Sequence, residues 1–422
     1  MKKILFIIQS YPSEKSANVL CDERVMKELI SSGNFEVHCL CYKYANQLKE
    51  EIIGNIHVHR WDRGLWWKIY SKAEYRKMKN GKLVVKLNRF FMRIKQIICI
   101  PIFPIYEPLL LIHYKKQAVK LFDLVNFDMV LAEYNGLDTL YAGWQLKRNR
   151  KVKFIPIFWD SLSGGFRPKY LPASFVDKRK ARLEKKVLTD CDCAIVMQSH
   201  RDNIKKIYKN DPFIMEKIIF LDIPYLSICN QQPVSVYDKS KINIVFAGNM
   251  NMRDPTYFFK VVENIDVKNI VIHFYTKRMD HQRIRRIALD HNVTVELNDY
   301  VSHDTLKKFL NDADILLNFG VANPNAISGK VFEYIGYMKP IISTYFIDNE
   351  AVIPVLKKYP SALLIDERKK PEEYKFSITN LLLNQGKNKI DVGMIKREYR
   401  KNMPESYVLK LEEILKEGGN FE

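Results

Sequence analysis

Residues 325–344 decide the fold, and they read Asn-Ala-Ile-Ser-Gly-Lys-Val-Phe-Glu-Tyr-Ile-Gly-Tyr-Met-Lys-Pro-Ile-Ile-Ser-Thr. Apolar side chains recur at helical spacing from Val331 to Met338, and Pro340 prevents the helix from continuing. An apolar run at 314–319 and a second one directly after the proline predict buried strands. The unit is therefore strand, loop, helix, strand, and the loop opens at the helix N-terminus.

The start of this helix has the chemistry of an anion site. Ser328 is a good N-cap residue, and the backbone N–H groups and the dipole of a helix N-terminus favour a phosphate. Lys330 and Glu333 are three residues apart, so they share one face of the helix. A cation beside a hydroxyl-binding carboxylate suits a phosphorylated sugar or nucleotide. An ordinary surface ion pair is the alternative that this unit alone leaves open.

Length and composition bound the remaining possibilities. The 422 residues predict two or three domains. A hydrophobic share of 47% with 12% aromatics is enough for packed cores, which excludes wholesale disorder. The net charge of +20 calls for an anionic partner, and phosphates, anionic lipid and nucleic acid all satisfy it.

The cysteines and the N-terminus indicate a cytosolic protein. The seven cysteines are odd in number and include no Cys-x-x-Cys pair, so neither a disulfide framework nor a zinc site of that type is predicted. The apolar run at 4–8 is too short for a signal peptide, and no small-residue cleavage site follows it. We interpret it as the first core strand.

The first half of the chain has the pattern of a doubly wound sheet. A strand at 4–8, a helix ending near residue 31 and a strand at 35–41 form a β-α-β opening. Two later strands end in Glu133 and in Asp160. Because ligands bind at the carboxyl ends of strands in such sheets, these two carboxylates are candidate acceptor-side groups.

Residues 76–116 predict a membrane-surface element. Basic residues recur from 76 to 95 with no acid among them, beside an apolar stripe at helical spacing. An apolar, hairpin-like stretch at 97–112 follows, but it is too short to span a bilayer, and three prolines and Glu107 break it. This combination suits an anionic bilayer surface, and a solvated basic face beside ordinary core helices is the alternative.

A second β-α-β series follows a linker predicted at 211–236. It begins with a strand at 242–248, and the loop after this strand carries Arg253, which could clamp a diphosphate. Further strands are expected at 270–275 and 293–297, and a helix at 302–311 leads into the opening stretch.

Two doubly wound domains with a Lys-x-x-Glu helix in the second resemble the GT-B fold, and in particular the family 4 retaining glycosyltransferases of bacterial surface polysaccharide synthesis. The resemblance is carried by residues 328–342, by 300–319 before them, and by the Phe246-Ala247-Gly248 strand end. It implies an α/β protein with two Rossmann-like domains that face each other across a cleft. We expect the acceptor-side domain at 1–230, the nucleotide-sugar domain at 240–395, and a C-terminal helix at 396–422 that returns to the first domain.

The resemblance also implies a role for each of the site residues. Arg253 and Lys330 would neutralise the donor diphosphate and the charge on the leaving nucleotide, and Glu333 would hold the ribose hydroxyls, with no metal or other cofactor required. Asp160 is the acceptor-side catalytic candidate. The expected donor-binding set comprises Gly248, Asn249, Asn251, Arg253, Tyr275, Ser328, Gly329, Lys330 and Glu333.

Three features depart from the family pattern. No histidine stands at the usual acceptor-side strand end, where we expect Trp159 and Asp160 instead. A glutamate often stands eight residues before the one at position 333, but here that position holds Asn325, which we retain as a catalytic candidate. The first loop, at 9–17, lacks the usual glycine pair, so acceptor contacts are not carried over.

Two sets of possible metal ligands are expected to be structural. His57 and His59 share one face of a strand-like run, but no further ligand cluster lies nearby in the sequence. The pairs at 190/192 and 312/314 spell Asp-x-Asp, the metal motif of the other main glycosyltransferase fold, yet each stands at the amino side of a strand, away from the ligand crevice.

The leading hypothesis is a bacterial glycosyltransferase on the cytoplasmic face of the cell membrane. It would move a sugar from a nucleotide diphosphate-sugar to a lipid-linked oligosaccharide or polysaccharide precursor, and residues 76–116 would contact the anionic membrane. The alternatives are a GT-B nucleotide-sugar epimerase, a non-catalytic GT-B scaffold subunit, and a basic nucleic-acid-binding protein. Because the basic residues lie beside an apolar, proline-broken segment, we do not expect a nucleic-acid partner.

Overall fold

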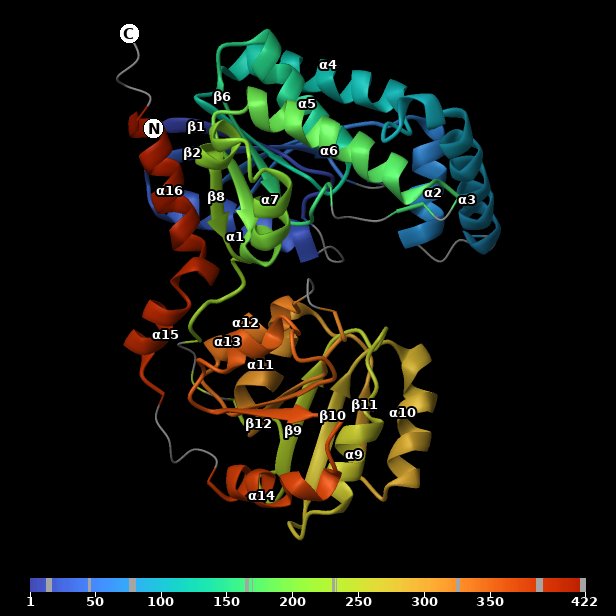
Figure 1. The fold of residues 1–422 in the computed structure, drawn as a ribbon, viewed down its shortest axis with the longest axis vertical. Coiled ribbons are helices and arrows are strands. Elements are labelled where there is room, and N and C mark those ends of the chain that lie inside the picture. The colour runs from blue at the N-terminus through green and yellow to red at the C-terminus, as the bar shows by residue number, and fades with distance from the viewer. Residues whose placement is uncertain are drawn as a thin grey trace. The chain divides into compact units, whose positions relative to one another are not determined.

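The computed structural model describes residues 1–12, 17–44, 47–75, 81–163, 167–168, 170–229, 232, 234–323, 327–384 and 390–417. The chain forms two compact units (Figure 1). Unit 1 comprises Met1–Pro224 and Pro404–Glu422, and unit 2 comprises Tyr225–Met403. The chain therefore leaves unit 1, builds unit 2 and returns to unit 1 for its last helix.

Unit 1 is built on an eight-stranded sheet in the order β3-β4-β2-β1-β5-β6-β7-β8. All neighbouring strands pair in parallel except β3, which is antiparallel to β4. Short apolar runs form the central strands because both faces of the sheet are covered. The strands are β1 (Lys2–Ile7), β2 (Phe35–Tyr42), β3 (Glu50–Ile53), β4 (Ile56–Trp61), β5 (Met129–Glu133), β6 (Lys153–Phe158), β7 (Ala194–Met197) and β8 (Ile218–Leu221).

Helices cover this sheet, and the last of them comes from the C-terminus. Helix α16 (Pro404–Glu417) packs against α1 (Ala17–Ser31), and the Tyr407 hydroxyl donates to the Asp222 carbonyl at 2.7 Å. Tyr407 and Leu411 of this helix are fully buried. The other covering helices are α4 (Pro108–Val125), α5 (Leu137–Asn149), α6 (Ala173–Asp190), α7 (Arg201–Ile207) and α8 (Pro212–Lys217), with short 3-10 turns at Ile100–Ile102 and Gln198–His200.

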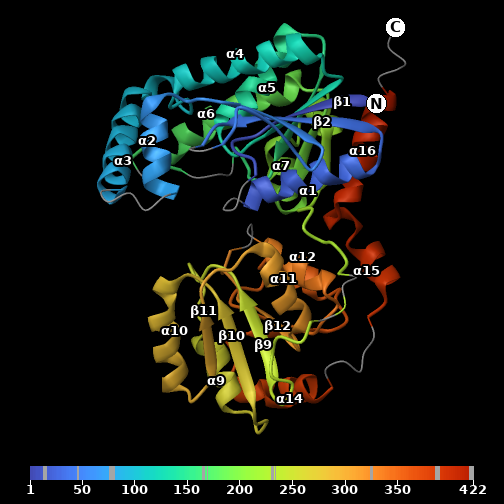
Figure 2. The same cartoon turned by 180° about the vertical axis from the view of Figure 1, so that it is seen from behind.

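Helices α2 (Leu65–Tyr75) and α3 (Gly81–Ile98) lie side by side at the end of unit 1 away from α16 (Figures 1 and 2). The Trp66 indole N–H joins them by donating to the Asn88 side chain at 2.9 Å. Within the described residues, no helix is long and apolar enough to cross a membrane.

Two expectations for unit 1 need correction. The predicted linker at 211–236 begins too early, because α8 and β8 lie there and β8 pairs with β7. The stretch at 97–112 is the end of α3, a 3-10 turn and the start of α4, rather than a surface hairpin. Its inner side belongs to the protein core, since Phe103 and Leu111 are buried.

Unit 2 contains a six-stranded, fully parallel sheet in the order β11-β10-β9-β12-β13-β14. Its strands are β9 (Ile242–Ala247), β10 (Ile270–Tyr275), β11 (Val295–Asn298), β12 (Ile315–Asn318), β13 (Ile341–Tyr345) and β14 (Ala362–Asp366). Its helices are α9 (Thr256–Glu263), α10 (Arg278–Asp290), α11 (His303–Asp312), α12 (Gly329–Gly336), α13 (Val352–Leu356), α14 (Lys375–Leu383) and α15 (Val392–Glu398), with 3-10 turns at Pro371–Tyr374 and Arg400–Asn402.

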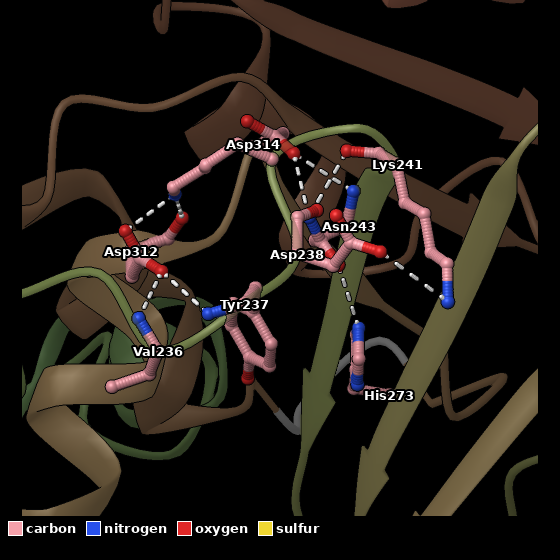
Figure 3. A network of polar contacts seen from close by, with 9 residues as sticks. Val236, Tyr237, Asp238, Lys241, Asn243, His273, Asp312 and Asp314 are labelled. Carbon is pink, nitrogen blue, oxygen red and sulfur yellow. Dashed lines mark hydrogen bonds and ion pairs between the residues drawn. The ribbon is translucent and has the colours of Figure 1, made fainter.

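The acidic pair at 312/314 lies at the amino end of this sheet (Figure 3). The Asp312 carboxylate accepts hydrogen bonds from the backbone N–H groups of Val236 and Tyr237 at 2.8 and 2.9 Å. Asp314 accepts from the backbone N–H of Asn243 at 2.8 Å. These carboxylates fix the entry of the chain into β9, which is the structural role that the sequence predicts.

Candidate functional site

The candidate donor site of unit 2 lies where strand order changes direction. Strand β9 starts the sheet of this unit, β10 and β11 follow on one side of it, and β12 lies on the other side. In doubly wound sheets, ligands bind at the carboxyl ends of the strands beside such a switch point. The loop after β9 and the loop that leads from β12 into α12 therefore meet at the expected place.

A buried, ionised carboxylate, that of Glu333, lies in the middle of α12. The two oxygens of Glu333 are 2.7 Å from Lys330 Nζ and 3.1 Å from His303 Nε2, and the residue is 6% exposed. Burial alone raises the pKa of Glu333, but the charge of Lys330 and the hydrogen bonds from His303 and Lys330 outweigh it and lower this pKa to about 2. The Lys330–Glu333 pair predicted from spacing is present, and its carboxylate is charged at neutral pH.

His303 was missed by the sequence analysis. It is the first residue of α11, whose N-cap Ser302 accepts a hydrogen bond from the Thr305 backbone N–H. Residue 303 stands thirty positions before its carboxylate partner, and only the parallel sheet brings the start of α11 beside α12. The sole signal in the sequence was a histidine in the first turn of an expected helix.

Arg253 is held in the loop after β9 by backbone carbonyl groups. Its guanidinium donates to Phe319 O at 3.2 Å, at the end of β12, and to Asn249 O at 2.8 Å. Burial lowers the pKa of Arg253, but an arginine in a protein stays charged. Carbonyl oxygens do not neutralise a cation, so Arg253 keeps its full positive charge in this loop.

Helix α12 is fixed to the end of β9. The Ala247 backbone N–H donates to the Tyr334 hydroxyl oxygen at 3.0 Å, and Tyr334 is buried. Ser328 is the N-cap residue, as predicted, but within the described part of the chain its side chain makes no capping bond. The first N–H groups of α12, including that of Gly329, are therefore not capped by this side chain.

The remaining predicted donor residues have mainly structural contacts. The Gly248 N–H donates to the Tyr275 carbonyl at 3.1 Å, and the Asn251 N–H donates to the Asn249 side chain at 2.7 Å, which shapes the loop. Tyr275 stacks on Phe309, and its hydroxyl is 3.0 Å from that of Tyr237. The Tyr275 side chain is 4% exposed, and its role is therefore in the packing of the core.

Asn325 lies outside the described residues, so its place relative to Glu333 stays a prediction.

A second carboxylate cluster occupies unit 1, at the carboxyl ends of β5 and β6. Glu133 and Asp22 are both buried, and Trp159 Nε1 donates to Asp22 at 3.0 Å. Burial raises the pKa of Asp22 to about 7 and that of Glu133 well above its ordinary range, and the two carboxyl groups also interact. Asp160 stays exposed and accepts from the Asn18 side chain at 3.1 Å. Asp22 was missed because it lies within a helix.

The elevated pKa of Asp22 makes stability depend on pH. The pKa of Asp22 is about 7 in the folded protein and 3.8 in the unfolded chain. The contribution of Asp22 to the free energy of unfolding is therefore fully present below pH 3.8 and is lost as the pH rises to 7. Asn at position 22 stays neutral, so we expect Asp22→Asn to lose less stability than the parent as the pH rises toward 8.

The prediction is checked by unfolding midpoints measured from pH 5 to pH 8. The exposed Asp160→Asn variant is the control, and it should follow the parent. Identical pH profiles for Asp22→Asn and the parent would contradict the assignment.

Comparison with known proteins places the fold but not a family. No protein-family profile matches the sequence, and no curated protein matches it. Among solved structures, the Anabaena protein Alr3699/HepE, in complex with UDP and glucose, is similar with a TM-score of 0.59 at 10% identity, over 99% of this chain and 100% of that one. TarM gives 0.59 at 10% identity, over 98% and 99% of the two chains.

Two further structures belong to enzymes of different activity. The lipopolysaccharide outer core galactosyltransferase WaaB gives a TM-score of 0.55 at 11% identity, over 99% of both chains. The UDP-GlcNAc 2-epimerase of Methanocaldococcus jannaschii gives 0.53 at 11% identity, over 97% and 99%. At such low identity the likeness concerns the fold alone. The two parallel-sheet units of this chain are those of the GT-B fold, as the sequence predicts.

Proposed function

We propose that this chain is a glycosyltransferase that moves a sugar from a nucleotide diphosphate-sugar to a lipid-linked saccharide at the inner face of the cell membrane. The observation that carries the proposal is the ionised, buried Glu333 between Lys330 and His303, at the strand ends where Arg253 is also held. A buried carboxylate flanked by donors can accept the two hydroxyl groups of a ribose, and the nearby cations suit a diphosphate.

The proposed chemistry is electrostatic. When the glycosidic bond to the diphosphate breaks, negative charge grows on the leaving nucleotide. The ammonium group of Lys330 has three N–H donors, so it can keep its bond to Glu333 and also donate to a phosphate oxygen. The Arg253 guanidinium, fixed by two carbonyl oxygens, needs no reorganisation to face the same charge. We propose retention of anomeric configuration and no metal requirement, both on the resemblance to family 4.

The exposed carboxyl group of Asp160 gives the proposal an acceptor side in unit 1. Asp160 is exposed at the end of β6 and can accept a proton or a hydrogen bond from an acceptor hydroxyl. Glu133 is buried, and the elevation of its pKa keeps it protonated, so we do not assign it a base role. This revises the sequence-based expectation, which placed Glu133 and Asp160 together on the acceptor side.

The test is incubation of the full chain with a panel of nucleotide-sugars, starting with UDP-glucose because the HepE structure holds UDP and glucose. Ligand-dependent stabilisation and nucleotide release that requires an added lipid-linked acceptor support the transferase. A new sugar epimer formed without acceptor would favour the epimerase alternative, which the epimerase neighbours keep open. No response to any nucleotide-sugar would overturn the donor site.

The membrane part of the proposal rests on α3. Its apolar stripe is exposed and includes Leu83, Leu87, Phe90, Phe91, Ile94, Ile97 and Ile98. Lys86, Arg89 and Arg93 are exposed on the same helix. An apolar stripe flanked by cations matches an anionic bilayer surface, where each Lys or Arg contributes about 1 kcal/mol.

Removing the apolar stripe is expected to detach the protein from vesicles. We predict that the triple variant Leu87→Asp, Phe90→Asp, Ile94→Asp stays with the soluble fraction in flotation with phosphatidylglycerol vesicles, whereas the parent floats. A matched triple of exposed residues in unit 2, Leu289→Asp, Phe376→Asp and Leu383→Asp, should float like the parent. Equal flotation of both triples, or dimerisation of the parent through α3 without vesicle binding, would contradict the prediction.

A further inference from the structure

Three strands at one side of the unit 1 sheet bring histidines and glutamates together. The parallel pairing of β2 with β4 sets His38 directly beside His57, and their rings stack with centroids 4.6 Å apart. Glu36 lies two residues before His38, on the same face of β2. The ligand atoms of Glu36, His38 and His57 all lie within 4.8 Å of one another. No ligand cluster lies near His57 along the chain, as expected, but the sheet brings Glu36 and His38 beside it.

A relay of polar contacts continues from this group to the edge strand. Glu36 Oε1 is 2.7 Å from His38 Nε2, and His38 Nδ1 is 2.9 Å from His59 Nε2. His59 Nδ1 is in turn 2.5 Å from Glu50 Oε2, because the antiparallel register of β3 and β4 sets Glu50 opposite His59. The relay has two carboxylates at its ends and two imidazoles between them.

Counting N–H groups along the relay shows that one of its three contacts lacks a hydrogen. Each neutral imidazole has one N–H, so two rings supply two hydrogens for three contacts. If His38 Nδ1 donates to His59 and His59 Nδ1 donates to Glu50, the His38 Nε2 lone pair faces the Glu36 carboxylate. Two acceptors at 2.7 Å repel each other, so in this tautomer the relay is complete only when a cation lies at that contact or when a third proton joins it.

The surroundings favour a metal ion at this contact. Lys3 Nζ lies 4.0 Å from Glu36 Oε1 and is partly exposed, too distant to replace a bond between the two acceptors. His38 is buried, with Phe127 packed edge-on against its ring, whereas Glu36 and His57 are half-buried and leave a path from solvent. His57 adds a third donor that the relay itself does not use.

We propose that Glu36, His38 and His57 bind a divalent transition metal, with zinc as the best match. Two imidazole nitrogens and one carboxylate oxygen are a common set of zinc ligands, with solvent at the fourth position. Bond lengths of about 2 Å require the donor atoms to end roughly 3–3.5 Å apart, which small side-chain rotations supply. His59 and Glu50 act as positioning residues, because they fix the tautomer and the orientation of the His38 ring.

The site is separate from the proposed transfer chemistry. Glu36 and His38 lie in the amino-terminal half of β2, whereas ligands of doubly wound sheets bind at the carboxyl ends of the strands. A bound ion would cross-link β2 and β4 directly, and β3 through Glu50. We therefore assign it a structural role at the edge of the unit 1 sheet.

The test uses the full chain, treated with chelator and dialysed, then titrated with zinc by calorimetry and followed by thermal unfolding. We expect one zinc per chain, a higher unfolding midpoint, and tetrahedral absorption bands when cobalt replaces zinc. His57→Ala and Glu36→Gln, both at half-buried positions, should abolish or strongly weaken binding. His59→Gln should weaken it about 10–100-fold. His113→Ala, an exposed histidine on α4, is the matched control and should bind like the parent.

Two results would overturn the proposal. The first is zinc binding by His57→Ala and Glu36→Gln with the affinity of the parent. The second is a chain that does not respond to zinc at all. If that chain becomes more stable on mild acidification and Glu36→Gln loses this effect, a third proton completes the relay in place of the metal.

Discussion

Lys330→Ala is expected to lower kcat about 10²–10³-fold, the usual cost of removing one preorganised donor from the charge that develops in a transition state. Lys330 Nζ is 2.7 Å from Glu333, so its removal also takes one of two partners that the described residues offer this buried carboxylate, the other being His303. Glu333→Gln should act differently. This variant keeps the cation of Lys330 but weakens the hydrogen bonds to the ribose hydroxyls, so we expect the larger change in KM.

The measurement is steady-state transfer with the donor and acceptor found in the nucleotide-sugar screen. Lys307→Ala is the matched control, because Lys307 and Asp304 form an ion pair of the same i,i+3 spacing at 3.1 Å on the exposed face of α11. That variant should keep the kcat of the parent. Full turnover by Lys330→Ala would show that the pair on α12 is only structural.

Gly336→Ala is expected to destabilise unit 2 by about 3 kcal/mol or more, or to prevent soluble expression. A Cβ at this position would stand 2.2 Å from the backbone oxygen of Ser227. That segment cannot easily retreat, since the Cys229 N–H donates to the Gly336 carbonyl at 2.9 Å. The end of α12 touches the chain so closely that only glycine fits.

Chemical unfolding of the purified variants measures this effect. Gly248→Ala is the control, because the nearest atom to its added Cβ is a ring carbon of Phe246 at an ordinary 3.4 Å. Unfolding curves for Gly336→Ala that coincide with those of Gly248→Ala would show that the Ser227 segment moves without cost.

What the sequence predicted well is local. The spacing of Lys330 and Glu333 on one helix, the apolar stripe of α3 and the β-α-β order of both units follow from periodicities within a few residues. These signals do not depend on which strands become neighbours.

What the sequence did not predict depends on strand order. His303 meets Glu333, and His38 meets His57, only after the sheets have formed. In the second case the antiparallel β3 comes between β2 and β4 in the chain, although β2 and β4 are neighbours in the sheet. A single sequence contains no periodic signal for such a pairing.

The apolar stretch at 97–112 shows a further limit. Its residues alternate between core and surface, since Phe103 and Leu111 are buried while Leu109 and Ile112 are exposed. Hydrophobicity alone does not predict which of these residues are buried, because burial depends on the side on which the rest of the unit packs.

The return of the chain to unit 1 sets the order in which the protein can be completed during synthesis. Helix α16 leaves the ribosome after all of unit 2, yet it supplies the fully buried Tyr407 and Leu411 that pack onto unit 1 beside α1. Unit 2, encoded between the two parts of unit 1, can therefore fold while the first unit still exposes an apolar face. Unit 1, whose sheet is translated before unit 2, therefore gains its covering helix α16 only after unit 2 has been made.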